Sequence, residues 1–311
     1  MALDTYPDIW NRVLLRVPSA SSLLAQDWVS NAFRQVAERR PWSWLIKRGQ
    51  YLFPAVYKTG TVSVTFNSTT VTGSGTAFTS AMVGRQFRIG FQVPIYTIAA
   101  VPDATTLTLD QVWGGDDASG VGFEIYVAYQ TVPADFNYHL SVWDPKFNWQ
   151  LRRNVTQEEI NDYDAQRANQ ASSSYVVVSY AYDQTTTPPR PRFEMWPHQK
   201  SQYCYPYLYV ARATDLADSG ANLPFYLRGD VLLEMALAEA ARWPGSSRDK
   251  PSPFYSLSLA IMHERRSERM IVEMERQDDE VYEQDVKYAL SLPFSPLPWM
   301  DASFLQSHAL G

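Results

Sequence analysis

The sequence has few of the residues from which small catalytic and metal sites are usually built. Of its 311 residues, one is cysteine, Cys204, and four are histidine. A single cysteine excludes a disulfide within the chain, and the flanking Tyr203 and Tyr205 predict a strand residue with a structural thiol. No stretch approaches the roughly 18 apolar residues that span a bilayer, and Asp4 and Asp8 stand where a signal peptide would be apolar. We therefore expect a protein without membrane segments, made in a reducing cytoplasm.

Charged residues are also scarce, at 19% of the chain. There are 27 Lys and Arg against 33 Asp and Glu, which gives a net charge of −6. A protein that coats nucleic acid carries a broad basic face, and this balance argues against one. Hydrophobic residues reach 45%, which excludes wholesale disorder. The length predicts about two domains, or one domain with a large insert.

Aromatic residues are abundant, with 10 Trp, 19 Tyr and 14 Phe. They cover large contact areas and are enriched at interfaces. A tyrosine-rich β-protein would carry them as well, so composition alone leaves both interpretations open.

Both ends of the chain have helical patterns. The first 50 residues predict one helix that starts after Thr5 and ends at Pro18, and a second from about Ser22 to Arg40. Near the other end, apolar residues at helical spacing predict a helix over 230–243. A longer helix is expected over about 254–290, with Leu257, Ile261 and Met274 among its apolar positions. The remaining residues are rich in proline and aromatic side chains and predict an extended tail.

The middle of the chain has β-strand patterns. Val62, Val64 and Phe66 alternate with polar residues, and short strands with such punctuation indicate a small β-barrel or sandwich. Gly73-Ser74-Gly75 lacks the features of a phosphate loop and predicts a hairpin turn. Farther on, Thr156-Gln157-Glu158-Glu159 has the form of a capping box, and 175–182 reads as a strand.

Charge is distributed unevenly along the chain. Residues 1–50 carry seven Lys and Arg against four Asp and Glu, whereas residues 230–311 carry eight against fourteen. The acidic surplus lies near the end of the long helix, at Asp278, Asp279, Glu280, Glu283 and Asp285. A solvated helix surface explains these acids, and so does an acidic wall that repels a passing polyanion.

The residues do not predict a catalytic, cofactor or metal site. None of the four histidines pairs with another His or Cys at metal-ligand spacing: they are His139, His198, His263 and His308. We expect His263 on the polar side of the long helix and His198 exposed in a turn. Neighbouring carboxylates do not face each other on a helix, although distant acids could still form a glycosidase pair.

Several motifs, taken in order, resemble a known family. Residues 37–44, Ala-Glu-Arg-Arg-Pro-Trp-Ser-Trp, end the first helices. Residues 71–78, Val-Thr-Gly-Ser-Gly-Thr-Ala-Phe, open a β-module that continues through Met82-Val83-Gly84-Arg85 and strands at 96–101 and 105–109. Leu223-Pro224 and the helix over 230–243 follow. This plan resembles the head-to-tail adaptors, also called connector or head completion proteins, of tailed bacteriophages, and the β-module resembles one found in phage connector and tail proteins.

The resemblance implies a fold class: α+β, with a helical adaptor core, an inserted small β-barrel or sandwich, and an extended C-terminal tail. The expected division is 1–56 for the N-terminal helices, 57–130 for the inserted β-domain, 131–229 for a mixed β-rich region, 230–290 for the C-terminal helices and 291–311 for the tail.

The resemblance also implies partners and a location. Adaptors form a homo-oligomeric ring, usually of twelve copies, under the portal protein at the neck of the virion, after synthesis in the bacterial host cytoplasm. The ring receives the tail nozzle or tail tube and leaves a channel through which double-stranded DNA passes without being held. Their C-terminal segment commonly binds the portal. The corresponding anchors here are Phe294, Leu297, Trp299, Phe304 and Leu305, and the acids at 278–285 become candidates for channel-facing residues.

Two other function classes remain. The aromatic β-module would also suit a tail-fibre or baseplate protein that binds host surface glycan. An enzyme, for example a wall hydrolase, is the third hypothesis, and we expect the chain not to be one.

Overall fold

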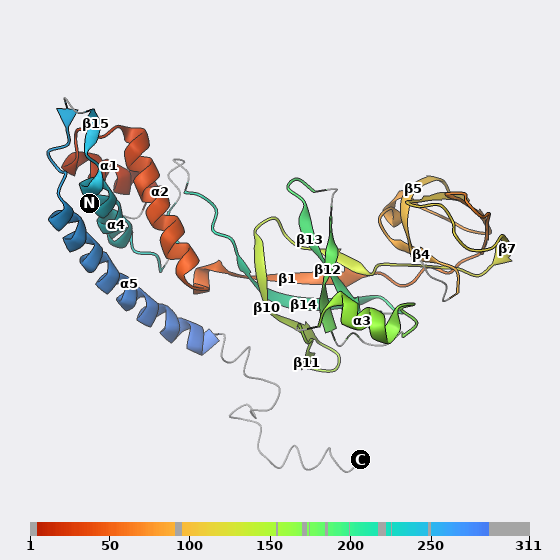
Figure 1. The fold of residues 1–311 in the computed structure, drawn as a ribbon. Coiled ribbons are helices and arrows are strands. Elements are labelled where there is room, and N and C mark those ends of the chain that lie inside the picture. The colour runs from red at the N-terminus through yellow and green to blue at the C-terminus, as the bar shows by residue number, and fades with distance from the viewer. Residues whose placement is uncertain are drawn as a thin grey trace, which may run out of the picture. The chain divides into compact units, whose positions relative to one another are not determined.

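The chain forms two compact units in the computed structural model (Figure 1). The structure describes residues 5–90, 95–153, 155–169, 173, 175–183, 186–198, 200–216, 222–224, 226–247 and 250–285; within these ranges, the side chains of 176–182, 247, 250 and 281–285 are not described. The helical unit comprises the described parts of 1–47 and 210–311, and the β-rich unit comprises those of 48–209. The polypeptide therefore leaves the helical unit once and returns to it once.

Four α-helices build the helical unit: α1 (Tyr6–Arg16), α2 (Ser22–Arg39), α4 (Gly229–Arg242) and α5 (Leu257–Asp285). A short hairpin of β15 (Gly245–Ser247) and β16 (Lys250–Pro251) precedes α5. Helix α4 packs against α1, α2 and α5, and buried side chains occur on all of its sides. A helix that is apolar all round lies at the centre of a bundle, so α4 is the core of this unit.

Side-chain caps fix where the first two helices start. Thr5 accepts a hydrogen bond from the backbone N–H of Asp8, and Pro7 occupies the first turn of α1. Ser21 accepts one from the N–H of Leu24 at the start of α2. The helices predicted at both chain ends are confirmed.

The first part of the β-rich unit is a seven-stranded curled sheet, which appears as the ring of orange and yellow strands in Figure 1. Its strands are β2 (Thr61–Val64), β3 (Thr70–Ser74), β4 (Gln86–Arg88), β5 (Tyr96–Asp103), β6 (Thr106–Leu109), β7 (Ala118–Val121) and β8 (Glu124–Tyr126), with a 3₁₀ turn at Ser80–Met82. They lie in the order β7-β2-β3-β6-β5-β4-β8.

The predicted alternation of these strands is confirmed where they bury one face. Val62 and Val64 of β2 and Leu107 and Leu109 of β6 point into one apolar core. Phe66 does not continue the pattern, because β2 ends at Val64 and this side chain is 64% exposed.

The glycine-rich segment 73–75 was predicted to be a hairpin turn, and this is wrong. Gly73 and Ser74 belong to strand β3, where they pair with Val62 and Thr61 of β2. Gly75 follows with φ +67°, the left-handed region that glycine adopts without strain.

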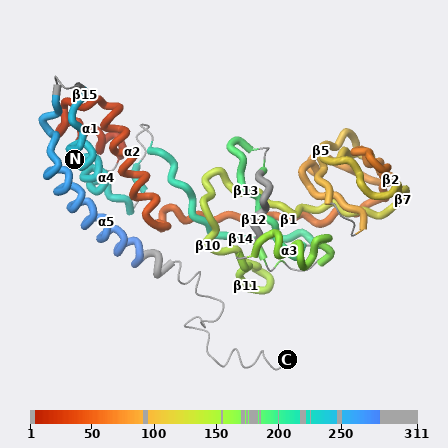
Figure 2. The backbone as a smooth tube through the Cα atoms, viewed as in Figure 1, coloured from red at the N-terminus to blue at the C-terminus, as the bar shows by residue number. Residues whose placement is uncertain are grey.

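Two further sheets complete the β-rich unit. One has the order β1-β14-β10-β11 and contains β1 (Ile46–Phe53), β10 (Phe136–Asp144), β11 (Trp149–Gln150) and β14 (Tyr203–Ala211). The other, β12-β13-β9, contains β9 (Tyr129–Thr131), β12 (Tyr175–Asp183) and β13 (Arg190–Trp196), with α3 (Gln157–Asp164) beside β12. The strands that carry the chain out of and back into the helical unit, β1 and β14, are neighbours (Figure 2).

The predicted fold class, a helical core with a small inserted β-domain, is wrong. Sixteen strands and five α-helices occur among the described residues, and β-structure forms the larger part of the fold instead of an insert in a helical core. One reason is local: β1 begins at Ile46, inside the 1–56 segment assigned to the N-terminal helices, where Lys47, Arg48 and Gly49 hide the strand alternation. The other is that the strands of 131–211 form sheets of their own.

Candidate interaction site on the helical unit

The segment that leaves α2 anchors two tryptophans in the helical unit. Pro41 follows the helix and prevents its continuation. Trp42 is fully buried, and its indole Nε1 donates a 2.6 Å hydrogen bond to the backbone oxygen of Val36. The Trp44 ring stacks on Phe33 with 5.9 Å between centroids. These contacts fix the direction in which the chain leaves α2, in the stretch that carries the family resemblance.

Arg39, the last residue of α2, binds two glutamates of α5. Its Nη1 and Nη2 atoms donate to the two carboxylate oxygens of Glu268 at 2.9 and 2.7 Å, and its Nε donates to Glu275 Oε1 at 2.7 Å. The two-pronged geometry matches the planar guanidinium to a carboxylate. Hydrogen bonding and the positive charge of Arg39 lower the pKa of Glu268, so this contact is strongest when the glutamate is ionised.

The next residues extend this contact along α5. Arg40 binds the carboxylate of Asp279 and donates to the backbone oxygen of Glu275 at 3.3 Å. Ser43 donates through its backbone N–H, at 3.2 Å, and through its hydroxyl to Asp278. The Asp278 side chain is fully buried. We call Arg39, Arg40 and Ser43 with their α5 partners the α2–α5 clasp.

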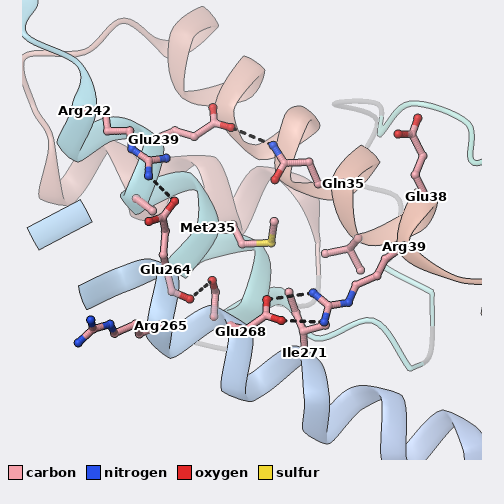
Figure 3. A pocket seen from close by; sticks show the side chains of 13 residues that line it. Gln35, Glu38, Arg39, Met235, Glu239, Arg242, Glu264, Arg265, Glu268 and Ile271 are labelled. Atoms are coloured by element: carbon pink, nitrogen blue, oxygen red, sulfur yellow. Dashed lines mark hydrogen bonds and ion pairs between the residues drawn. The ribbon is translucent and has the colours of Figure 1, made fainter. Parts of the chain in front are cut away.

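A cavity of about 790 Å³ lies beside the clasp, between α2, α4 and α5 (Figure 3). Met235 and Ile271 contribute apolar surface to it. Some of the charged side chains around it are paired, as Arg39 is with Glu268 and Arg242 is with Glu264 (Figure 3). Arg265 also lines the cavity and has no ion-pair partner in the described part of the chain, so the cavity combines apolar surface with charge that is not fully neutralised.

Glu239 differs from the other acids of this cavity. Burial raises its pKa, and the nearby charge of Asp27 raises it further, while hydrogen bonds from Asn31 and Gln35 oppose the change. Glu239 therefore takes up a proton at a higher pH than an ordinary glutamate, which makes the cavity more neutral as the pH falls.

The structure separates the acids that were predicted to face a DNA channel. Asp278 is buried against Ser43, whereas Asp279 pairs with Arg40, and Glu280 with Arg276 on the same helix. Glu283 and Asp285 belong to α5, but their side chains are not among those described. Whether any of these acids lines a channel stays a prediction.

The predicted portal anchors, Phe294, Leu297, Trp299, Phe304 and Leu305, lie outside the described residues.

The clasp accounts for part of the uneven charge along the chain. Arg34 pairs with Asp215 at 2.9 Å, as Arg39 and Arg40 pair with acids of α5. The basic surplus of the first 50 residues is thus partly neutralised within the chain. The sequence-based predictions did not include these pairs, although the opposite charge surpluses of the two helical segments were the signal for them.

A second group of charges is buried in the β-rich unit. Arg167 binds Glu194 through Nε at 2.5 Å and through Nη2 at 3.2 Å, and both side chains are almost fully buried. His198 lies beside them and is also buried, so the prediction that it is exposed is wrong. Burial alone would raise the pKa of Glu194, but the nearby His198 and Arg167 lower it.

His263 was predicted on the polar side of the long helix, and this is also wrong. Its Nδ1 lies 2.6 Å from Glu234 Oε2 of α4, and both side chains are buried. The predicted periodicity failed because a hydrogen-bonding partner on α4 allows a polar side chain on the inner face of α5, where an apolar one was expected.

The described residues contain no group of three or more His, Cys, Asp and Glu side chains that could hold a metal ion. Within the same part of the chain, no helix has both the length and the apolar composition needed to cross a membrane. No protein-family model matches the sequence, and no curated protein matches it either.

Proposed function

We propose that this chain is a structural protein of the head–tail junction of a tailed bacteriophage, where copies of it form a ring between the portal and the tail around a DNA channel. The proposal starts from the resemblance of residues 37–44 and 71–109 to head-to-tail adaptors. The structure supports it because both stretches form defined parts of the fold. The first forms the α2–α5 clasp, and the second folds into a sheet with its own apolar core.

The observation that carries the proposal is the outer face of α5. Leu257, Ile261 and Met262 are 61, 47 and 53% exposed, although the sequence pattern placed the first two in the apolar stripe of this helix. Arg265 and Arg269 lie among them and line the same surface hollow; neither has an ion-pair partner in the described part of the chain. An exposed apolar face with unpaired charges is typical of a protein–protein contact.

A ring places such a face against a different surface of the next copy. The second half of α5 carries the exposed acids Glu273, Asp279 and Glu280; each already pairs with Arg276 or Arg40 of the same chain, so a contact with the neighbour would share or exchange these partners. In this arrangement the basic, apolar half of one subunit's α5 contacts acidic surface of its neighbour.

Mass photometry of the purified full-length chain tests ring formation. We expect closed oligomers for the wild-type chain and loss of these oligomers for Ile261→Asp, which places a charge in the contact. Phe66→Asp is the matched control, since Phe66 is also an exposed apolar residue, 64% against 47% for Ile261, but belongs to the β-rich unit, and it should still form rings. A wild-type chain that stays monomeric, or an Ile261→Asp variant that assembles normally, contradicts the proposed contact.

The C-terminal segment provides a separate test of the partner. Deleting residues 292–311 should abolish binding to the portal protein while leaving the circular dichroism spectrum and the ring intact. Unchanged portal binding would refute the assignment of Phe294, Leu297, Trp299, Phe304 and Leu305 as anchors.

A further inference from the structure

A second cavity, of about 370 Å³, lies within the β-rich unit. Tyr126 of β8, Glu194 of β13 and His198 line it, together with residues of β4, β9, α3 and the loops beside them. On the α3 side, Asn161 and Ala165 are exposed. The volume falls within the range of small-molecule sites.

The ionic groups of this cavity are already satisfied by one another. Arg167 uses Nε and Nη2 on Glu194, Nη1 on the backbone oxygen of Asp164 and Nη2 also on Asn161 Oδ1. Both carboxylate oxygens of Glu194 accept from Arg167, and Gln157 approaches one of them at 3.4 Å. A ligand with a net charge would bring an uncompensated charge beside this buried pair, which is costly.

Two other side chains of the cavity, in contrast, have buried polar atoms without a hydrogen bond in the described part of the chain. The hydroxyl of Tyr126 has no hydrogen-bond partner in the described part of the chain, and neither ring nitrogen of His198 has one. His198 Nε2 comes nearest to a partner, at 3.5 Å from Glu194 Oε1. Both side chains are only 4% exposed, and buried polar groups in native proteins are almost always hydrogen-bonded.

We propose that this cavity binds a neutral, hydroxyl-rich small molecule of the size of one sugar ring. A phenol hydroxyl both donates and accepts, and imidazole nitrogens donate or accept according to their protonation; sugar hydroxyls act in both roles and can therefore complement either state. Ile95, Ala128 and Ala165 supply apolar wall for the C–H face of such a ring. This site is independent of ring assembly and goes beyond the head–tail proposal.

Saturation-transfer NMR with the full-length chain tests the site, using glucose, galactose, mannose and N-acetylglucosamine as probes. At least one of them should give a saturable signal. Glucuronate and glucosamine, the charged counterparts, should bind at least tenfold more weakly than the neutral sugar. No binding by any neutral sugar means that the cavity holds ordered water only and overturns the proposal, as does tighter binding of a charged counterpart.

A variant that closes the cavity locates the binding. Ala165→Trp fills the exposed side of the cavity and should remove the signal, whereas Ala168→Trp, at an exposed position of the same segment outside the lining, should keep it. Equal binding by both variants would place the sugar elsewhere and refute the site.

Removing one hydroxyl measures the contact itself. Tyr126→Phe should weaken binding about three- to tenfold, the effect of one neutral hydrogen bond, without lowering the melting temperature, since this hydroxyl has no partner within the described chain. Tyr163→Phe, on exposed α3 surface, is the control and should bind normally. Unchanged affinity in Tyr126→Phe contradicts the proposal.

A sugar in this cavity can be free or the end of a glycan. A linear tetrasaccharide of the best neutral sugar distinguishes them: equal affinity of tetramer and monomer indicates that a chain end enters, and loss of binding indicates a free sugar.

Discussion

The two units use the same pair of residue types, arginine and glutamate, in opposite surroundings. In the helical unit, Arg39 and Glu268 form a two-pronged contact whose side chains are 34 and 55% exposed. In the β-rich unit, Arg167 and Glu194 make a similar contact with 5 and 1% exposure. The geometry is nearly the same, so solvent access is the main difference between them.

That difference determines what each pair does. Water and salt screen an exposed pair, which typically contributes less than about 1 kcal/mol. A buried pair has lost its hydration, so removing one partner leaves a bare charge in the interior. The clasp therefore orients α2 and α5 at modest energetic cost, whereas the buried pair makes the β-rich unit depend on a single arginine.

Breaking the buried pair should have the largest effect. Arg167→Ala removes the arginine that pairs with the buried Glu194 carboxylate and leaves it, among the described residues, only the more distant His198 and Gln157; this should destabilise the β-rich unit by about 3–5 kcal/mol. Hydrogen exchange measured by mass spectrometry, which reports each unit separately, is the readout. The double variant Arg167→Met, Glu194→Leu should recover most of the loss; a single variant that costs less than about 1 kcal/mol would show that burial does not govern this pair.

Two adjacent acids of α5 allow the same comparison between a buried and an exposed contact within one helix. Asp278→Ala removes the acceptor for the backbone and hydroxyl groups of Ser43 and should cost about 2 kcal/mol. Asp279→Ala removes an exposed partner of Arg40 and should cost about 0.5 kcal/mol or less. Urea denaturation of the full-length chain compares them, and equal losses would contradict the difference in burial.

Lowering the pH should weaken the β-rich unit before the clasp. Burial, with a smaller contribution from Arg153, lowers the pKa of His139 from 6.5 to about 3. His139 therefore takes up a proton near pH 6.5 in the unfolded chain but only near pH 3 in the folded chain. The free energy of unfolding falls as the pH is lowered between these values. At pH 5 the loss from this group is roughly 2 kcal/mol.

The clasp responds over a different range of pH. The pKa of Glu268 is lowered by Arg39, so its contribution is lost only as the pH falls below the ordinary glutamate value. His139→Gln should reduce the change in stability of the β-rich unit between pH 7 and 5, as measured by hydrogen exchange. An unaltered pH dependence in this variant would remove His139 as the cause.

Replacing Arg39 of the clasp should have a small effect that depends on salt. Arg39→Ala should cost about 0.5–1 kcal/mol at low salt, and the difference from wild type should largely disappear near 1 M salt, where screening is strong. Thermal unfolding at the two salt concentrations is the measurement. A loss that salt leaves unchanged would mean that Arg39 acts through packing of its stem.

Local patterns in the sequence predicted individual elements well. Caps and prolines located α1 and α2, the capping box at Thr156 starts α3 as expected, and the alternation from Tyr203 onward corresponds to β14. The arrangement of these elements could not be predicted in the same way, because pairing of β1 with β14 joins segments more than 150 residues apart and leaves no local periodicity.

The environment of the candidate site residues could not be predicted from local patterns either. Asp278 and Asp279 are adjacent acids of identical chemistry, yet Asp278 is buried against Ser43 while Asp279 is exposed and pairs with the half-buried Arg40. His198 was predicted to be exposed because it follows Pro197 in a turn, but tertiary packing with Tyr126 and Glu194 buries it. Burial of a polar residue depends on distant partners, and these are what one sequence does not reveal.

The central claim, that this chain forms the ring at a phage head–tail junction, is tested most directly by a cryo-electron microscopy reconstruction of that junction in virions whose genome encodes the chain. The account predicts a closed ring of density between portal and tail into which the helical and β-rich units each fit. A reconstruction that resolves portal and tail and has no density for this chain between them would contradict it.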